Sequence, residues 1–211
     1  MKNKKIVDQE EILKMNTTAW PFYLDQMPPY VWEKNFLSPE QCDEIIEYGK
    51  SLVPTKGLIG GSIPEEKTKN TQVRSSNISW IKPVKQFEWL YRKITDAVVS
   101  LNHEYYKFDI FGSMECLQFT NYKAPGDHYI AHTDRGTGII IRKLSVTIQL
   151  SDPKDYKGGD LTIYESANGT KVEKERGMLI VFPSFMLHEV TPVKKGERNS
   201  LVCWVTGNQF K

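Results

Sequence analysis

The stretch from residue 144 to residue 150 reads LSVTIQL, with apolar and polar side chains in strict alternation. A period of two is typical of a β-strand that buries one face. Further short segments of strand character follow toward the C-terminus, separated by glycine, proline or asparagine turns, at residues 160–164, 178–182, 187–193 and 198–206. Many short strands joined in this way favour a β-sandwich or a β-barrel.

Two helices are expected ahead of these strands. The first begins at Pro39, directly after the N-cap residue Ser38, and ends before Pro54. The second runs from about residue 86 to residue 101, where apolar residues recur at helical spacing. The segment between them, residues 55–79, contains several glycine, lysine and serine residues, and it is predicted to form a long mobile loop or a loose hairpin.

The order of these elements predicts the architecture. Because the helices precede the strands instead of alternating with them, we expect a mainly β fold with flanking helices. A single domain is predicted over residues 1–211, with an N-terminal helical support at about residues 36–102 and a β-barrel core at about residues 112–207. A chain of 211 residues buries enough surface to fold without a disulfide or a structural metal.

The composition disfavours several classes of protein, among them nucleic-acid-binding proteins and membrane proteins. The chain has 28 Lys+Arg residues and 26 Asp+Glu residues, and a net charge of +2 gives no electrostatic footprint for nucleic acid. Three widely spaced cysteines without a CxxC motif favour reduced thiols. No apolar run approaches the roughly 18 residues of a membrane helix, and charged residues stand where a signal peptide needs an apolar stretch. We therefore expect a cytoplasmic protein with neither a membrane nor a nucleic acid as partner.

A candidate metal site lies around His132. In an extended chain His132 and Asp134 point the same way, so one ion could take both side chains. His188, in a later apolar strand, is the candidate third ligand. Two imidazoles and one carboxylate with open positions are typical of non-haem Fe(II) oxygenases. The same donors can also hold zinc, so a zinc hydrolase remains an alternative.

Arg198 adds a second feature to this site. If residues 195–197 form a three-residue turn, a hairpin places His188 and Arg198 on one face of the sheet, inside the barrel. A buried guanidinium is costly unless it is paired. A dicarboxylic co-substrate that chelates the metal at one end could pair with Arg198 at the other. A hydrolase would have no need for this arginine.

Several motifs, taken in order, resemble one known family. They are YKAPGDHYIAHTD at residues 122–134, GGDL at residues 158–161, and then His188 and Arg198. Together they are similar to the 2-oxoglutarate- and Fe(II)-dependent dioxygenases of the prolyl 4-hydroxylase type, over residues 36–204. The resemblance implies a double-stranded β-helix core, which is a jelly-roll, cupin-like fold.

The resemblance also implies a role for particular residues. His132, Asp134 and His188 would be the iron ligands, and Arg198 would pair with the C5 carboxylate of 2-oxoglutarate. Tyr122 would line the co-substrate pocket. Gln149 stands where some members carry a second tyrosine, and it can still donate a hydrogen bond to the carboxylate. The residues expected to face the substrate are Arg74, Trp80, Tyr129, Arg142 and Trp204.

The implied activity is hydroxylation of a prolyl residue in a peptide or protein, with release of succinate and CO₂. Fe(II) would be the cofactor, 2-oxoglutarate and O₂ the co-substrates, and ascorbate an additional candidate cofactor. One alternative is a dioxygenase of a free amino acid, a lysyl residue or a nucleobase. The other is a non-catalytic β-barrel binding module.

Overall fold

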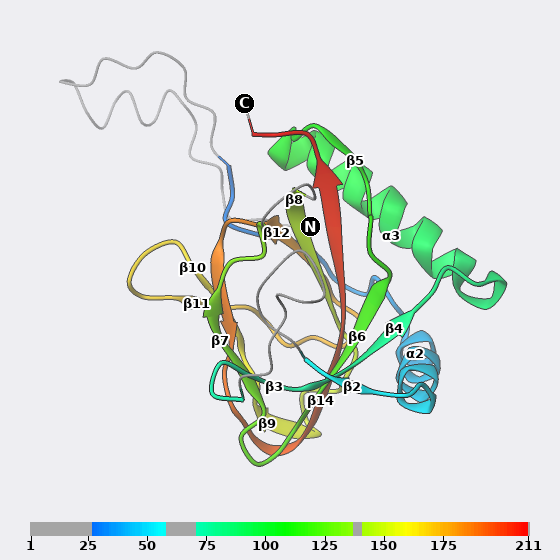
Figure 1. Ribbon diagram of the computed structural model, residues 1–211, viewed down its shortest axis with the longest axis vertical. Helices are drawn as coiled ribbons and strands as arrows, with labels where there is room; N and C mark the ends of the chain where they lie inside the picture. The colour runs from blue at the N-terminus through cyan, green and yellow to red at the C-terminus, as the bar shows by residue number, and fades with distance from the viewer. Residues whose placement is uncertain (1–26, 58–70, 137–140, 211) are drawn as a thin grey trace.

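A computed structural model describes residues 27–57, 71–136 and 141–210. In these ranges it contains two antiparallel sheets that form a jelly-roll (Figure 1). The larger sheet has the order β1 (Val31–Glu33), β12 (Leu179–Pro183), β8 (Arg142–Gln149), β14 (Val193–Gly207), β6 (Leu117–Lys123), β4 (Asn77–Ile81) and β2 (Thr55–Lys56), and β5 (Ile110–Gly112) and β9 (Tyr156–Gly158) also pair with β14. The smaller sheet has the order β11 (Thr170–Lys171), β10 (Leu161–Tyr164), β13 (Leu187–Val190), β7 (His128–His132) and β3 (Arg74–Ser75).

The two faces of β8 explain why the larger sheet sits where it does. Leu144, Val146 and Ile148 are buried in a cluster with side chains of α2 (Pro39–Ser51) and α3 (Glu88–Leu101). Both helices therefore cover the outer face of this sheet (Figure 1). The alternating polar residues point inward, toward the smaller sheet. The prediction of a mainly β fold with helices on the outside is confirmed.

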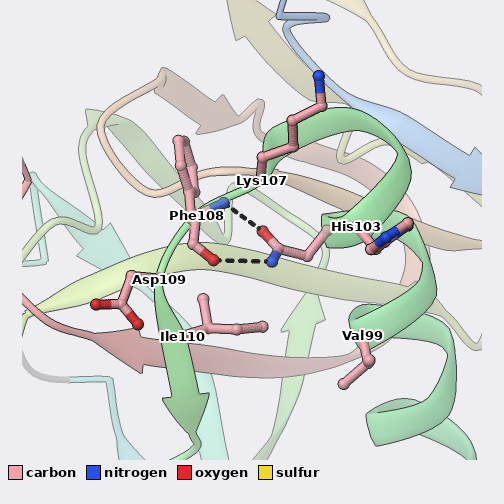
Figure 2. Close-up of a pocket in the computed structure, with 7 residues that line it drawn as sticks. Val99, His103, Lys107, Phe108, Asp109 and Ile110 are labelled. Carbon is pink, nitrogen blue, oxygen red and sulfur yellow. Dashed lines mark hydrogen bonds between the residues drawn. The ribbon is translucent and has the colours of Figure 1, made fainter.

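Local hydrogen bonds fix the start of α2 and the end of the helical turn that follows α3. Ser38 caps α2 as predicted: its hydroxyl accepts from the backbone N–H of Gln41, and the Gln41 side chain accepts from the backbone N–H of Ser38. A π-helical turn, Asn102–Tyr106, follows α3. The Asn102 amide ends it by two hydrogen bonds to the backbone of Phe108, at 2.9 and 3.0 Å (Figure 2).

An open depression of about 600 Å³ lies beside this turn, between the end of α3 and the start of β5 (Figure 2). His103 and Asp109 stand on its rim, and none of its lining residues belongs to the predicted metal site. Within the described part of the chain, no helix is long and apolar enough to cross a membrane.

The segment predicted as a mobile loop or loose hairpin is strand at both ends. β2 pairs with β4, with Thr55 opposite Ile78, and β3 joins the smaller sheet, with Arg74 opposite Tyr129. Buried Ile78 and Ile81 anchor β4 in the larger sheet, which a mobile loop would not allow. The hairpin alternative is therefore the better description of these ends, while residues 58–70 lie outside the described residues.

The predicted hairpin between His188 and Arg198 is wrong. β13 pairs with β7 and β10 in the smaller sheet, whereas β14 begins at Val193 and pairs with β6 and β8 in the larger sheet. The chain crosses between the sheets at Pro192, which has no N–H to continue a ladder. His188 and Arg198 consequently line the same cavity from opposite walls.

Candidate active site

Three potential metal ligands meet on the smaller sheet. His132 ends β7, Asp134 follows two residues later, and His188 lies directly opposite His132 in the β7–β13 ladder. Their donor atoms all lie within 4.8 Å of one another. The Nε2 atoms of His132 and His188 stand 3.6 and 3.4 Å from the carboxylate oxygens of Asp134. The geometry thus brings together the predicted triad.

Backbone carbonyls fix the orientation of both imidazoles. His132 Nδ1 lies 2.8 Å from the carbonyl oxygen of Ile130, and His188 Nδ1 lies 2.9 Å from that of Met186. A carbonyl oxygen only accepts, so each Nδ1 carries a proton and each Nε2 is turned toward the carboxylate of Asp134. Ligating histidines are commonly held in this way. The donor set of two imidazoles and one carboxylate therefore fits Fe(II).

Hydrogen bonds fix both the backbone and the side chain of Asp134. Its N–H donates to the carbonyl of Ser184 at 2.8 Å, and its Oδ2 accepts from the hydroxyl of Ser145 at 2.7 Å. Burial alone would raise the pKa of the Asp134 carboxyl. The adjacent imidazoles of His188 and His132 more than offset this effect and hold the pKa well below its ordinary value. The carboxylate is therefore ionised at neutral pH.

Replacing Ser145 with alanine is expected to weaken metal binding. The hydroxyl orients the carboxylate, and removing a partner of this kind typically costs about 10- to 100-fold in metal affinity. Titration calorimetry with Mn(II) measures the effect. Ser51→Ala is the matched control, because that hydroxyl bonds only the carbonyl of Tyr48 at the end of α2. Equal Mn(II) affinity in Ser145→Ala and wild-type protein would rule out this role.

Arg198 lies on the facing wall of the cavity and is 1% exposed. Its Nη2 donates to Gln149 Oε1 at 2.9 Å, and its Nη1 donates to Ser200 Oγ at 3.2 Å. Both partners are neutral. Among the described residues, Arg198 Nε and Gln149 Nε2 are buried donors without an acceptor. A buried cation with one unused donor of its own and a second on the neighbouring Gln149 fits a carboxylate ligand.

Gly159, in the GGDL motif, makes room for the arginine. A Cβ atom at this position would stand 3.0 Å from Arg198 Cδ and 3.0 Å from a methyl group of Val193. The residue also has a φ of +59°, a conformation that favours glycine. The turn before β10 therefore packs directly against the stem of Arg198.

The other predicted residues are distributed around the cavity. Tyr122 is buried, and its ring centroid lies 5.5 Å from the Arg198 guanidinium carbon. Trp80 is 36% exposed at the edge of the larger sheet, 6.4 Å from Trp204 between ring centroids. The full lining comprises Arg74, Gln118, Tyr122, Tyr129, His132, Asp134, Thr147, Leu161, His188, Val190, Arg198, Ser200, Val202 and Trp204. Three predicted residues do not line the cavity but contact residues that do, namely Gln149, Trp80 and Arg142.

A three-layer stack supports the metal triad from the side. The rings of Tyr129 and His132 are parallel within 17°, with centroids 3.5 Å apart. The Arg74 guanidinium lies over the Tyr129 ring, with its carbon atom 4.7 Å from the ring centroid. Burial raises the pKa of the Tyr129 hydroxyl to about 12, so the ring stays neutral. Arg74 and Tyr129 thus form one continuous wall with the His132 ring.

Ser145 and Tyr156 also stand at the site and were not among the predicted residues. Ser145 could have been found, because the alternation of residues 144–150 places it on the same face as Gln149. Tyr156, on β9, carried no signal in the sequence. Burial raises the pKa of its hydroxyl, and the nearby Arg198 guanidinium partly offsets that effect. Tyr156 is therefore a neighbour of Arg198.

The comparison with protein families agrees with this arrangement. Residues 117–206 match the model of the 2OG-Fe(II) oxygenase superfamily. The match begins at the start of β6 and ends one residue before the end of β14. These residues are similar to a 2OG-Fe(II) oxygenase domain. The name of this family refers to iron and 2-oxoglutarate, and the resemblance and the jelly-roll fold predicted from the sequence are both confirmed.

Curated proteins that are similar to this chain share one name. A PKHD-type hydroxylase from Sphingopyxis alaskensis is 32% identical over 143 residues, which is 65% of this chain and 65% of the relative. A PKHD-type hydroxylase from Nitrosomonas europaea is 35% identical over 94 residues, which is 41% of this chain and 40% of the relative. The chain thus spans between two fifths and two thirds of the length of these relatives.

A solved structure has the same fold as this chain. It is a prolyl hydroxylase from Trichoplax adhaerens in complex with a hypoxia inducible factor oxygen degradation domain peptide fragment. The TM-score is 0.67 at 21% identity, and the match covers 85% of this chain and 84% of the other. At this identity the match supports the fold, and the activity must be argued from the site.

Proposed function

We propose that this protein hydroxylates a prolyl residue in a peptide or protein, consuming 2-oxoglutarate and O₂ and releasing succinate and CO₂. One oxygen atom of O₂ would enter succinate and the other the new hydroxyl group. The observation that supports this best is the convergence of three potential iron ligands on one cavity with a buried arginine, where Arg198 Nε and Gln149 Nε2 lack an acceptor. Bound Fe(II) would supply the activation of O₂.

The residues of the chain have separate tasks in this proposal. His132, Asp134 and His188 hold the ion, and their carbonyl and serine partners keep the donor atoms aimed. Arg198 anchors the distal carboxylate of 2-oxoglutarate. Tyr122 and Leu161 close the cavity around the co-substrate and exclude water.

A peptide substrate is favoured over the other substrate classes. The named relatives are hydroxylases, and the structure from Trichoplax holds a peptide fragment. A net charge of +2 does not favour a nucleobase within a nucleic acid. A free amino acid and a lysyl residue remain alternatives, and so does a β-barrel that binds without turnover.

An assay with peptides tests the proposal. The purified protein is incubated with Fe(II), 2-oxoglutarate, ascorbate and proline-rich peptides, and mass spectrometry measures the gain of one oxygen atom. Peptides with alanine in place of proline, and lysine-containing peptides, are the matched controls. Oxygen gain that requires proline is expected. The absence of both oxygen gain and succinate would contradict the proposal, and gain on lysine alone would change the substrate class.

The state of the cysteines indicates the cellular compartment in which the protein works. Cys42, Cys116 and Cys203 are all free thiols, and burial raises the pKa of Cys42 and Cys203 to about 11. Buried, protonated thiols without a disulfide suit a reducing environment. We therefore propose the cytoplasm as the working compartment.

A further inference from the structure

An ion pair and an indole ring lie together at one side of the cavity. The Arg142 guanidinium carbon stands 3.9 Å from the ring centroid of Trp204. Glu115 binds the same guanidinium through two hydrogen bonds, at 2.8 and 2.7 Å. About one fifth of each charged side chain is exposed, so the pair is mostly shielded from water. Glu115 therefore holds the guanidinium while its flat face covers the indole.

A β-bulge brings Arg142 to this place. In the ladder between β8 and β14, Val205 pairs with Leu144 but Thr206 pairs with Arg142, so β8 contains one extra residue there. In regular alternation Arg142 would face the same way as Leu144, toward the helices. The bulge turns it to the opposite face, beside Trp204. The backbone thus directs the side chain of Arg142 to the face of the sheet that carries Trp204.

The backbone of Arg142 is tied down independently of its side chain. Its N–H donates to the carbonyl of Arg135 at 3.2 Å, and its carbonyl accepts from the hydroxyl of Ser184. Ser184 is also the residue whose carbonyl accepts from Asp134. Removing Glu115 should consequently release the guanidinium without disturbing the chain that carries Asp134.

We infer that Glu115 is a positioning residue for the substrate wall of this site, acting through Arg142 on the indole of Trp204. The inference rests on the proposed function, because it assigns Trp204 a place against the substrate. Arg142, expected from the sequence to face the substrate, would act from behind the indole instead. Its charge is already paired with Glu115, and its face is already packed against the ring. Trp204 Nε1, a buried donor without an acceptor in the described residues, lies in the same ring.

The expected effect is on substrate binding. In Glu115→Gln the side-chain size is kept and the charge is lost, so the guanidinium is no longer held flat against the ring. A shielded, bidentate pair of this kind supports a change in the KM for a proline-containing peptide of about three- to tenfold. The KM for 2-oxoglutarate should stay within about twofold, since Arg198 and Gln149 are not touched. Glu115→Asp should restore part of the peptide affinity.

Fluorine NMR tests the inference without relying on turnover. The full chain is labelled with 5-fluorotryptophan, and the resonance of residue 204 is the one that disappears in Trp204→Phe. We expect it to shift and broaden in Glu115→Gln and in Arg142→Lys, which keeps the charge but loses the planar fork. Glu88→Gln is the matched control, because Glu88 pairs with Arg92 on the exposed face of α3.

The KM measurements and the fluorine NMR experiment together distinguish a failure of the proposed function from a failure of the inference about Glu115. If wild-type protein hydroxylates no substrate, the proposed function fails, and the NMR experiment still decides whether Glu115 orders the indole. If wild-type protein is active, an unchanged residue-204 resonance together with an unchanged peptide KM in Glu115→Gln overturns the inference. An equal rise in the KM values for peptide and 2-oxoglutarate also overturns it, because that result indicates a general structural role.

Discussion

Asp134→Ala is expected to abolish Fe(II)-dependent succinate formation and to weaken metal binding more than about a hundredfold. Removing a mere hydrogen-bond partner of a ligand already costs about 10- to 100-fold, and this change removes the charged ligand itself. The two imidazoles that remain are neutral and cannot offset the charge of a divalent ion. Titration with Mn(II) measures affinity, and succinate formation with Fe(II) measures turnover.

The control for Asp134→Ala is another aspartate. Asp109 is an exposed carboxylate beside Asn208, far along the chain from the triad, so Asp109→Ala should bind Mn(II) like the wild type. Because Ser145 donates to Asp134, a melting curve should accompany both variants. Wild-type Mn(II) affinity in a folded Asp134→Ala protein would contradict the proposed metal site.

Arg198→Ala is expected to raise the concentration of 2-oxoglutarate needed for half-saturation by about a hundredfold or more. Hydrogen bonds to charged groups contribute about 1.5–3 kcal/mol each, and a bidentate contact makes two of them. Metal binding should stay largely intact, because Arg198 lies on the wall opposite the triad. Calorimetric titration of 2-oxoglutarate into Mn(II)-loaded protein measures the loss directly.

Two companion variants keep this prediction testable. Arg198 fills a fully buried position, so Arg198→Lys, which preserves charge and bulk, serves if the alanine variant does not fold. Gln149→Leu should give a smaller loss, about tenfold, because it removes one donor and leaves the guanidinium. A loss of metal equal to the loss of 2-oxoglutarate in the arginine variants would indicate a structural role instead.

Local patterns in the sequence were sufficient to predict most strands, both helices and the grouping of the triad. The alternation at residues 144–150 predicts which side chains pack under the helices and which face the cavity, and the structure agrees. The HTD spacing likewise places His132 and Asp134 together, because consecutive side chains of an extended chain alternate in direction. These features depend only on neighbours along the chain.

Features that depend on which strands pair could not be read in the same way. The segment from His188 to Arg198 looks like a hairpin, yet the chain crosses between sheets at Pro192, and β13 and β14 never pair. The bulge that turns Arg142 inward leaves no pattern in the sequence either. Glu115 was missed for a similar reason, since it lies between β5 and β6 and its partner Arg142 is 27 residues away on β8.

Diffraction from crystals grown with Mn(II) and 2-oxoglutarate, without O₂, tests the central claim most directly. We predict an anomalous peak in contact with His132 Nε2, His188 Nε2 and one carboxylate oxygen of Asp134, with the distal carboxylate of 2-oxoglutarate on Arg198. A metal peak away from these three side chains, or 2-oxoglutarate bound without touching Arg198, would contradict the account.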